Sequence, residues 1–319
     1  MTPLVRSHWS KPASILFATE VPPDEKLFSF ALAEALRGCS RLILFHAYDS
    51  LTAVSTEMAT GVRYYDLASA SRGKEELLKP FAERARAHGI ECEVVVCAGA
   101  AAERITAVAK ESCVDRIVMG TRSPGRLDKF LLGSVAESVL RSATVPVCIL
   151  GPNGVDRSVS GYRIDRILCA VEVGANGNSI VALAAEMALA NKARLVLVNV
   201  VRPVDWARMR ESLAEGCVES QLEAMIPVEL RRQLDFEVRI VTGEPAEEIL
   251  YQSNAVQADL LIMGAHGAPA FSTLVMQGVA YRVLAHAQMP VLTLSPLVRE
   301  RDSSRAAEEQ ALGFLAGVF

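Results

Sequence analysis

The sequence predicts an α/β protein made of two tandem domains, each with a five-stranded parallel sheet. Three observations support this class. The chain has 319 residues, which is enough for about two domains of roughly 150 residues. Short runs of apolar and β-branched residues alternate with longer stretches of helical periodicity, the pattern of parallel strands covered by helices on both faces. The two halves also repeat each other.

Five blocks of the first half return in the same order in the second half. ILFATEV at Ile15 returns as ILCAVEV at Ile167, and RLIL at Arg41 returns as RLVL at Arg194. Further along, AGAAAERI, DRIVMG and VPV return as TGEPAEEI, DLLIMG and MPV. Because five blocks keep their order, the pattern indicates the duplication of one domain.

The elements follow from hydrophobic periodicity and from the Gly, Pro, Asn and Ser residues that bound each run. In the first copy we expect strands at 14–19, 41–47, 91–97, 116–119 and 146–150, and helices at 24–37, 72–88, 101–112 and 134–142. In the second copy we expect strands at 166–171, 194–200, 236–241, 260–263 and 290–294, and helices at 177–190, 206–233, 245–254 and 278–286. In such a doubly wound, Rossmann-like sheet, ligands bind at the carboxyl ends of the strands.

The predicted domain boundaries follow from composition. The first domain covers 1–151 and the second covers 164–297, and a linker at 152–163 is rich in Gly, Asn and Ser. The tail at 298–319 places three large apolar residues on one helical stripe, so a helix is an option there.

Composition excludes several classes of function. The net charge of −4 argues against general binding of nucleic acid or of an anionic membrane. No apolar run is long enough to span a membrane, and the N-terminus has no signal-peptide pattern. The seven cysteines include no C-x-x-C pair, and we expect them to be reduced core thiols in a cytoplasmic protein.

The stretch from Asp115 to Leu150 carries most of the functional signal. Gly120 ends an apolar strand, and Ser134 is a natural N-cap for the helix that follows. The N–H groups at a helix start attract phosphate, and Gly133 lets an oxyanion approach the main chain. The alternative is that these residues only end a strand and cap a helix.

The spacing of Gly120, Ser123, Gly133 and Ser134 resembles the nucleotide loop of the universal stress protein family, G-x2-G-x9-G-[S/T], with a serine at the second glycine. The resemblance covers both repeats and implies a tandem member with an adenine nucleotide alpha hydrolase-like fold. It implies a stress-response or regulatory protein that binds ATP or a related adenine nucleotide, with or without Mg²⁺, and hydrolyses it slowly or not at all.

The resemblance also implies a nucleotide site in the first copy. Its expected residues are Ala18, Thr19, Glu20, Ala47, Met119, Gly120, Arg122, Ser123, Gly133, Ser134 and Val135. Glu20 replaces the family's aspartate, which moves the carboxylate outward by one methylene. The loop between the two glycines carries Arg122, Arg126 and Lys129 against a single Asp128, and these cations favour a polyphosphate.

The corresponding site in the second copy is expected to be degenerate. Its residues are Ala170, Val171, Glu172, Val200, Met263, Gly264, Gly267, Gln277 and Gly278. Gln277 stands where the motif requires glycine, and the loop contains His266 but neither Lys nor Arg. We therefore expect the second copy to bind nucleotide weakly or not at all, and we expect no metal site.

Of two other functions, one stays open and one is disfavoured. The main alternative is an interaction scaffold in which both sites are degenerate. The resemblance implies that the two domains then pair through their last strands, as domains of this family often do, and a homodimer is a further option. An ATP pyrophosphatase is disfavoured, because TEVPPDE and VEVGANG stand where such enzymes carry a phosphate loop. No H-E-x-x-H, G-x-S-x-G or Walker A pattern occurs, so no catalytic residue is predicted.

Overall fold

The computed structural model describes residues 7–49, 67–121, 132–154, 162–173, 177–203, 215–265 and 278–295. The chain forms two compact units. The first unit comprises the described residues from 12 to 139, with Tyr162, and the second comprises the other described residues. None of the helices described is both long and apolar enough to cross a membrane. The predicted domain boundaries stay a prediction.

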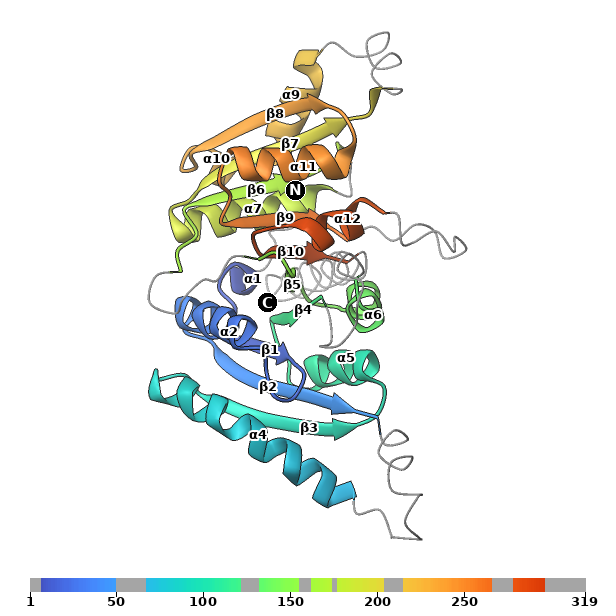
Figure 1. Ribbon diagram of the computed structural model, residues 1–319. Coiled ribbons are helices and arrows are strands. Elements are labelled where there is room, and N and C mark those ends of the chain that lie inside the picture. The colour runs from blue at the N-terminus through green and yellow to red at the C-terminus, as the bar shows by residue number, and fades with distance from the viewer. Residues whose placement is uncertain are drawn as a thin grey trace, which may run out of the picture. The chain divides into compact units, whose positions relative to one another are not determined.

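The first unit is a parallel sheet with the strand order β3-β2-β1-β4 (Figure 1). Its elements are β1 (Ser14–Ala18), α2 (Glu25–Gly38), β2 (Arg41–Tyr48), α4 (Leu67–Ala87), β3 (Cys92–Ala98), α5 (Ala101–Glu111) and β4 (Arg116–Gly120), and α6 (Ser134–Ser142) follows. All five residues of β1 are buried. A continuous buried run is typical of a parallel strand covered on both faces.

The second unit has the strand order β5-β10-β9-β6-β7-β8 (Figure 1). Its elements are α1 (Ser7–Ser10), β5 (Val147–Leu150), β6 (Arg166–Ala170), α7 (Asn178–Asn191), β7 (Arg194–Val201), α9 (Glu215–Met225), α10 (Val228–Arg231), β8 (Phe236–Thr242), α11 (Pro245–Ala255), β9 (Leu260–Gly264), α12 (Val279–His286) and β10 (Val291–Leu294). The strands from β6 to β10 are parallel to their neighbours, but β5 pairs antiparallel with β10.

The predicted fold class is confirmed, because the sheets of this α/β protein are mostly parallel and the two copies are in tandem. Every predicted strand is present, and its ends lie within one residue of the prediction. By its contacts β5, the last strand of the first copy, groups with the second compact unit. There it pairs with β10, and Thr293 Oγ1 also donates to Val147 O at 3.1 Å.

An aspartate holds the first and fourth strands of each copy in register. Asp115 Oδ2 accepts hydrogen bonds from the N–H groups of Ser14, at 3.1 Å, and of the residue before it, at 2.9 Å. Asp115 N in turn donates to Ser14 O at 2.9 Å. In the second copy, Asp259 makes the equivalent bonds with Arg166 and its neighbour. We call these two arrangements the aspartate clasps.

The two copies also share unusual helix ends. Cys39 and Lys192 follow α2 and α7 with φ of 52° and 54°, and Cys113 and Gln257 follow α5 and α11 with φ of 50° and 51°. Residues other than glycine seldom adopt this left-handed region. The left-handed conformation occurs at equivalent positions of both copies, which indicates that the duplication preserved the backbone path even where the side chains changed.

The expectation that the cysteines are core thiols is wrong for two of them. Cys39 and Cys113 are exposed, because they occupy these helix ends, whereas Cys92, Cys148 and Cys169 are buried. Burial raises the pKa of Cys92 to about 11. Such a buried thiol is chemically inert at neutral pH.

The predicted helix over 206–233 is also wrong. The structure has α9 and the short α10, with Pro227 as the N-cap of α10. Proline breaks a helix because it lacks an N–H and its ring clashes with the preceding turn. Two further differences are that α4 begins at Leu67 rather than at 72 and that α1 has no counterpart in the prediction. The residues 206–214 and the predicted tail helix lie outside the described residues.

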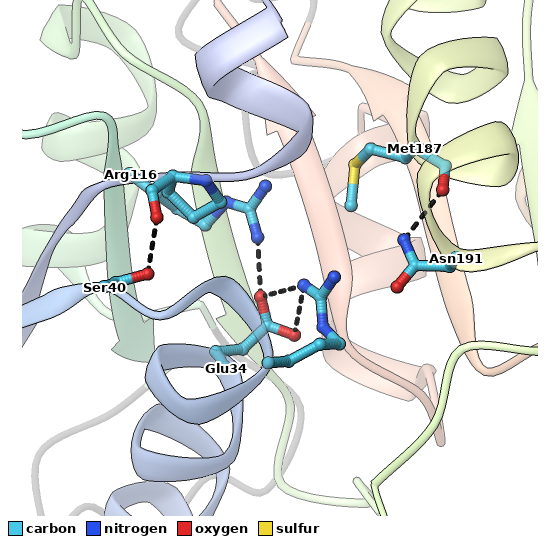
Figure 2. Close-up of polar contacts among 7 residues, drawn as sticks. Glu34, Ser40, Arg116, Met187 and Asn191 are labelled. Carbon is cyan, nitrogen blue, oxygen red and sulfur yellow. Dashed lines mark hydrogen bonds and ion pairs between the residues drawn. The ribbon is translucent and has the colours of Figure 1, made fainter. Parts of the chain in front are cut away.

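A buried ion pair lies in the core of the first unit (Figure 2). Arg116 on β4 and Glu34 on α2 are 1% and 2% exposed, and Arg116 Nη1 lies 2.5 Å from Glu34 Oε2. Arg37 donates to both carboxylate oxygens, at 2.8 and 2.9 Å. Burial by itself raises the pKa of Glu34, but the charges of Arg37 and Arg116 outweigh it and hold the pKa below its usual value.

We expect Glu34→Gln to lower the free energy of unfolding by about 3 to 5 kcal/mol at neutral pH, because it leaves Arg116 buried without this carboxylate. Urea denaturation of the full chain measures the change. Because the folded-state pKa is depressed, the carboxylate stabilises the fold above its usual pKa of 4.5 and loses this effect as it is protonated at lower pH. The difference between wild type and variant should therefore shrink as the pH falls below 4.5.

The matched control is Glu76→Gln, which removes an exposed carboxylate that pairs with Lys79 on α4. This change should leave the urea midpoint almost unchanged, since solvent screens exposed pairs. Equal destabilisation by both variants, or a difference that does not depend on pH, would contradict the assigned role of Glu34.

Candidate functional site

The carboxyl ends of three strands of the first unit meet at one edge of its sheet. Ala18 at the end of β1 lies opposite Phe45 of β2 and Met119 of β4. Thr19 N continues the pattern by donating to Phe45 O at 2.9 Å. The structure thus brings Ala18 and Thr19 together with Met119, as the sequence predicts. Ala47 lies two residues beyond Phe45 on the same strand.

The start of α6 is attached to the end of β4. Gly133 N donates to Thr121 O at 2.8 Å, although eleven residues separate the two in sequence, ten of them outside the described ranges. Gly133 O accepts from Glu137 N at 3.0 Å as the helix begins. The N–H groups of Ser134 and Val135 lie in the first turn, where a helix offers them no acceptor. Glu137 is the acidic residue of that turn.

The predicted site residues are not all within the described part of the chain. Arg122 and Ser123 lie outside it, as do the other loop cations, so their positions stay predictions. Gly120 lies at the end of β4 beside the first turn of α2, where a Cβ atom would be 3.1 Å from Leu27 Cδ2. Little room for a larger residue is left there. Glu20 follows β1 and is exposed.

His46 belongs to this region, although no sequence motif marks it. Its side chain is 6% exposed, and Nδ1 lies 2.9 Å from Thr19 O. A carbonyl oxygen can only accept, so Nδ1 carries the proton and Nε2 of the neutral ring is an acceptor. Burial lowers the pKa of His46, and the charge of Lys74 acts in the same direction, while the Thr19 bond and Glu20 oppose them.

Lys74 is a second residue of this region that no sequence motif marks. It comes from α4, and Nζ lies 5.3 Å from the centre of the Tyr48 ring at the end of β2. Lys74 therefore adds a positive charge near the carboxyl end of the sheet. Only the fold brings α4 to β2, so no local pattern could identify this residue.

In the second unit, a cavity of about 410 Å³ lies at the carboxyl ends of β6, β7 and β9. Six residues of the predicted second site line it, namely Ala170, Val171, Glu172, Val200, Met263 and Gly264. The remaining lining residues are Val173, Gly177, Ile180, Val198, Pro245, Ile249, Val279 and Ala280. Of the other predicted residues, Gly278 is the N-cap of α12, and Gly267 and Gln277 lie outside the described residues.

Asn199 performs the task of His46 in the second copy. Its Nδ2 atom donates to Val171 O at 2.9 Å, and Val171 is the counterpart of Thr19. Both side chains come from the second strand of their copy and hold the carbonyl that follows the first strand. Among the residues that the structure describes, no group of three His, Cys, Asp or Glu side chains is placed to hold a metal ion.

The family assignment rests on a match that spans both copies. The model of the universal stress protein family matches residues 13–151 and again 163–295. The chain belongs to the universal stress protein family. This family membership confirms the resemblance drawn from the glycine loop and the internal repeat.

Similar universal stress proteins occur in several organisms. One from Mycolicibacterium smegmatis is 26% identical over 225 residues, which is 66% of this chain and 70% of that protein. One from Mycobacterium tuberculosis is 26% identical over 188 residues, 56% of this chain and 61% of that protein. Among solved structures, a universal stress protein from Archaeoglobus fulgidus has a TM-score of 0.67 at 22% identity and covers 91% of this chain and 98% of its own. This likeness shows the fold.

We expect His46→Ala to lower the free energy of unfolding by about 1 to 3 kcal/mol, because the Thr19 carbonyl loses its donor. The matched variant His46→Asn introduces the residue type that the second copy uses. If the introduced amide donates as Asn199 does, the stability of this variant should stay close to that of wild type at pH 7. Chemical denaturation of both variants measures the difference, and equal losses would show that the bond to Thr19 is unimportant.

The pH dependence gives a second test of His46. The folded-state pKa is lowered from 6.5, so the unfolded chain binds the proton more readily than the native chain does. Wild type should therefore lose stability relative to His46→Asn as the pH falls below 6.5. A constant difference between pH 7 and pH 5 would contradict a buried, neutral imidazole.

Proposed function

We propose that the first copy binds ATP or a related adenine nucleotide and that the protein acts as a stress-response regulatory module with little or no hydrolysis. The observation that carries this proposal is the hydrogen bond from Gly133 N to Thr121 O at 2.8 Å. It attaches the start of α6 to the end of β4, which lies beside the end of β1. The start of α6 and the predicted nucleotide-site residues at the ends of β1 and β4 thus lie at one edge of the sheet, and a helix start favours anions.

The residues of the first copy fit a nucleotide polyphosphate. The N–H groups of Ser134 and Val135 and the positive end of the α6 dipole favour phosphate oxygens. Lys74 adds a cation at the same edge of the sheet, and the intervening loop carries Arg122, Arg126 and Lys129 in sequence. Glu137 in the first turn works against this attraction. A Mg²⁺ ion bound with the phosphates would offset part of their charge.

The second copy supports a weaker role in nucleotide binding. Its cavity has no Lys, Arg or His among its described lining residues, and its carboxylate, Glu172, has a counterpart in Glu20 of the first copy. The two copies therefore differ in cations, because a triphosphate would find Lys74 near the first site and no described cation at the second. This difference in charge supports a nucleotide site mainly in the first copy.

Thermal denaturation tests nucleotide binding. We expect Mg²⁺-ATP to raise the melting temperature of the full-length wild-type protein and to leave the melting temperature of Gly133→Glu unchanged. Glutamate adds bulk and negative charge where the phosphates are expected. A ligand at about 100 times its Kd adds about 2.7 kcal/mol to the stability, so the shift is measurable by differential scanning fluorimetry. Circular dichroism without nucleotide checks that the variant is folded.

Gly73→Glu is the matched control. Gly73 lies on α4, and a Cβ atom there would have no neighbour within 4 Å. This variant should respond to ATP as wild type does. If millimolar ATP leaves the wild-type melting temperature unchanged, the proposal fails and the interaction scaffold becomes the better interpretation. A normal response of Gly133→Glu would place any binding elsewhere.

A further inference from the structure

We propose that the cavity of the second copy binds a small, phosphate-free molecule that has an apolar body and a positively charged group. The two copies would then bind ligands of different chemistry on the same scaffold. This inference does not depend on nucleotide binding by the first copy. It rests on the size of the cavity, on its lining and on its charge.

The cavity has the size and the walls of a small-molecule site. Its volume of about 410 Å³ lies within the usual range of about 300 to 1,000 Å³ for such sites. Ile180, Val198, Ile249 and Met263 supply apolar walls from four different elements. Such walls favour an aliphatic or aromatic ligand body, because binding removes apolar surface from water.

The charge of the residues that line the cavity indicates which polar group the ligand carries. Glu172 is the only ionisable residue among those described as lining it. Within the described part of the chain, no Lys or Arg forms an ion pair with this exposed carboxylate. A cationic group therefore complements the site, whereas a phosphate does not.

Packing and hydrogen bonds hold the part of the cavity wall around Val171 and Gly177 in place. Val171 N donates to Val198 O at 3.0 Å, and Val171 O accepts from Asn199 at 2.9 Å. Gly177 is tightly covered, since a Cβ atom there would lie 2.3 Å from Met225 Cε and 2.6 Å from Val171 Cγ2. A wall that is fixed before binding reduces the entropy cost of association.

The experiment is isothermal titration calorimetry of the full chain with tryptamine, an indole with an ammonium group. Indole-3-acetate is the matched ligand, because it keeps the indole and replaces the ammonium with a carboxylate. We expect tryptamine to bind more tightly than indole-3-acetate. Ala280→Phe, which fills the cavity from the first turn of α12, should weaken tryptamine binding by about tenfold or more.

Two variants make the result specific to this cavity. Ala255→Phe adds the same side chain at the exposed end of α11, outside the residues that line the cavity, and should leave tryptamine binding unchanged. Glu172→Gln should weaken tryptamine by a few-fold and reduce its advantage over indole-3-acetate. Circular dichroism confirms that each variant is folded.

Three outcomes overturn the inference: no binding of tryptamine by wild type at millimolar concentration, equal loss in Ala280→Phe and Ala255→Phe, or tighter binding of indole-3-acetate. A repeat titration in saturating Mg²⁺-ATP separates this inference from the proposed function. Tryptamine that is displaced by ATP binds at the nucleotide site, which also overturns it. Failure of ATP to bind would leave the tryptamine result intact.

Discussion

The aspartate clasps are the constraint on which the predicted sites of both copies depend. Asp115 and Asp259 each tie the start of the fourth strand to the start of the first strand, through side chain and main chain together. In parallel strands, a fixed start also fixes the opposite ends. Ala18 therefore meets Met119, and Ala170 meets Met263, at the edge where ligands bind in such sheets.

The duplication has kept this scaffold and changed the chemistry at its edge. The backbone path is the same down to the left-handed residues that end equivalent helices. His46 and Asn199 even hold the same carbonyl with different side chains. The cations differ, however, because Lys74 lies near the predicted site of the first copy, whereas no Lys, Arg or His is described as lining the cavity of the second. Both copies carry a carboxylate there, Glu20 and Glu172. A scaffold that is held by backbone bonds leaves the side chains at its edge free to diverge.

Local patterns predicted most of the fold but only part of the site. The strands were predictable because β-branched runs are bounded by turn residues in the sequence itself. Six of the residues predicted for the second site do line one cavity. In the sequence, Arg116 looks like an ordinary strand residue. Its buried ion pair is formed with Glu34, which lies 82 positions away. The positions of His46 and Lys74 at this edge of the sheet could not be predicted for the same reason, since their partners come from other elements.

Residue types and their spacing predict the tandem duplication, the positions of the strands, the helix start at Ser134 and the loss of cations from the second glycine loop. Each of these follows from residue types and spacings that lie close together in the chain. The folded chain is needed to see that Glu34 neutralises a buried arginine and that the second copy contains a cavity. These features depend on contacts between distant segments, and no periodicity in the sequence records such contacts.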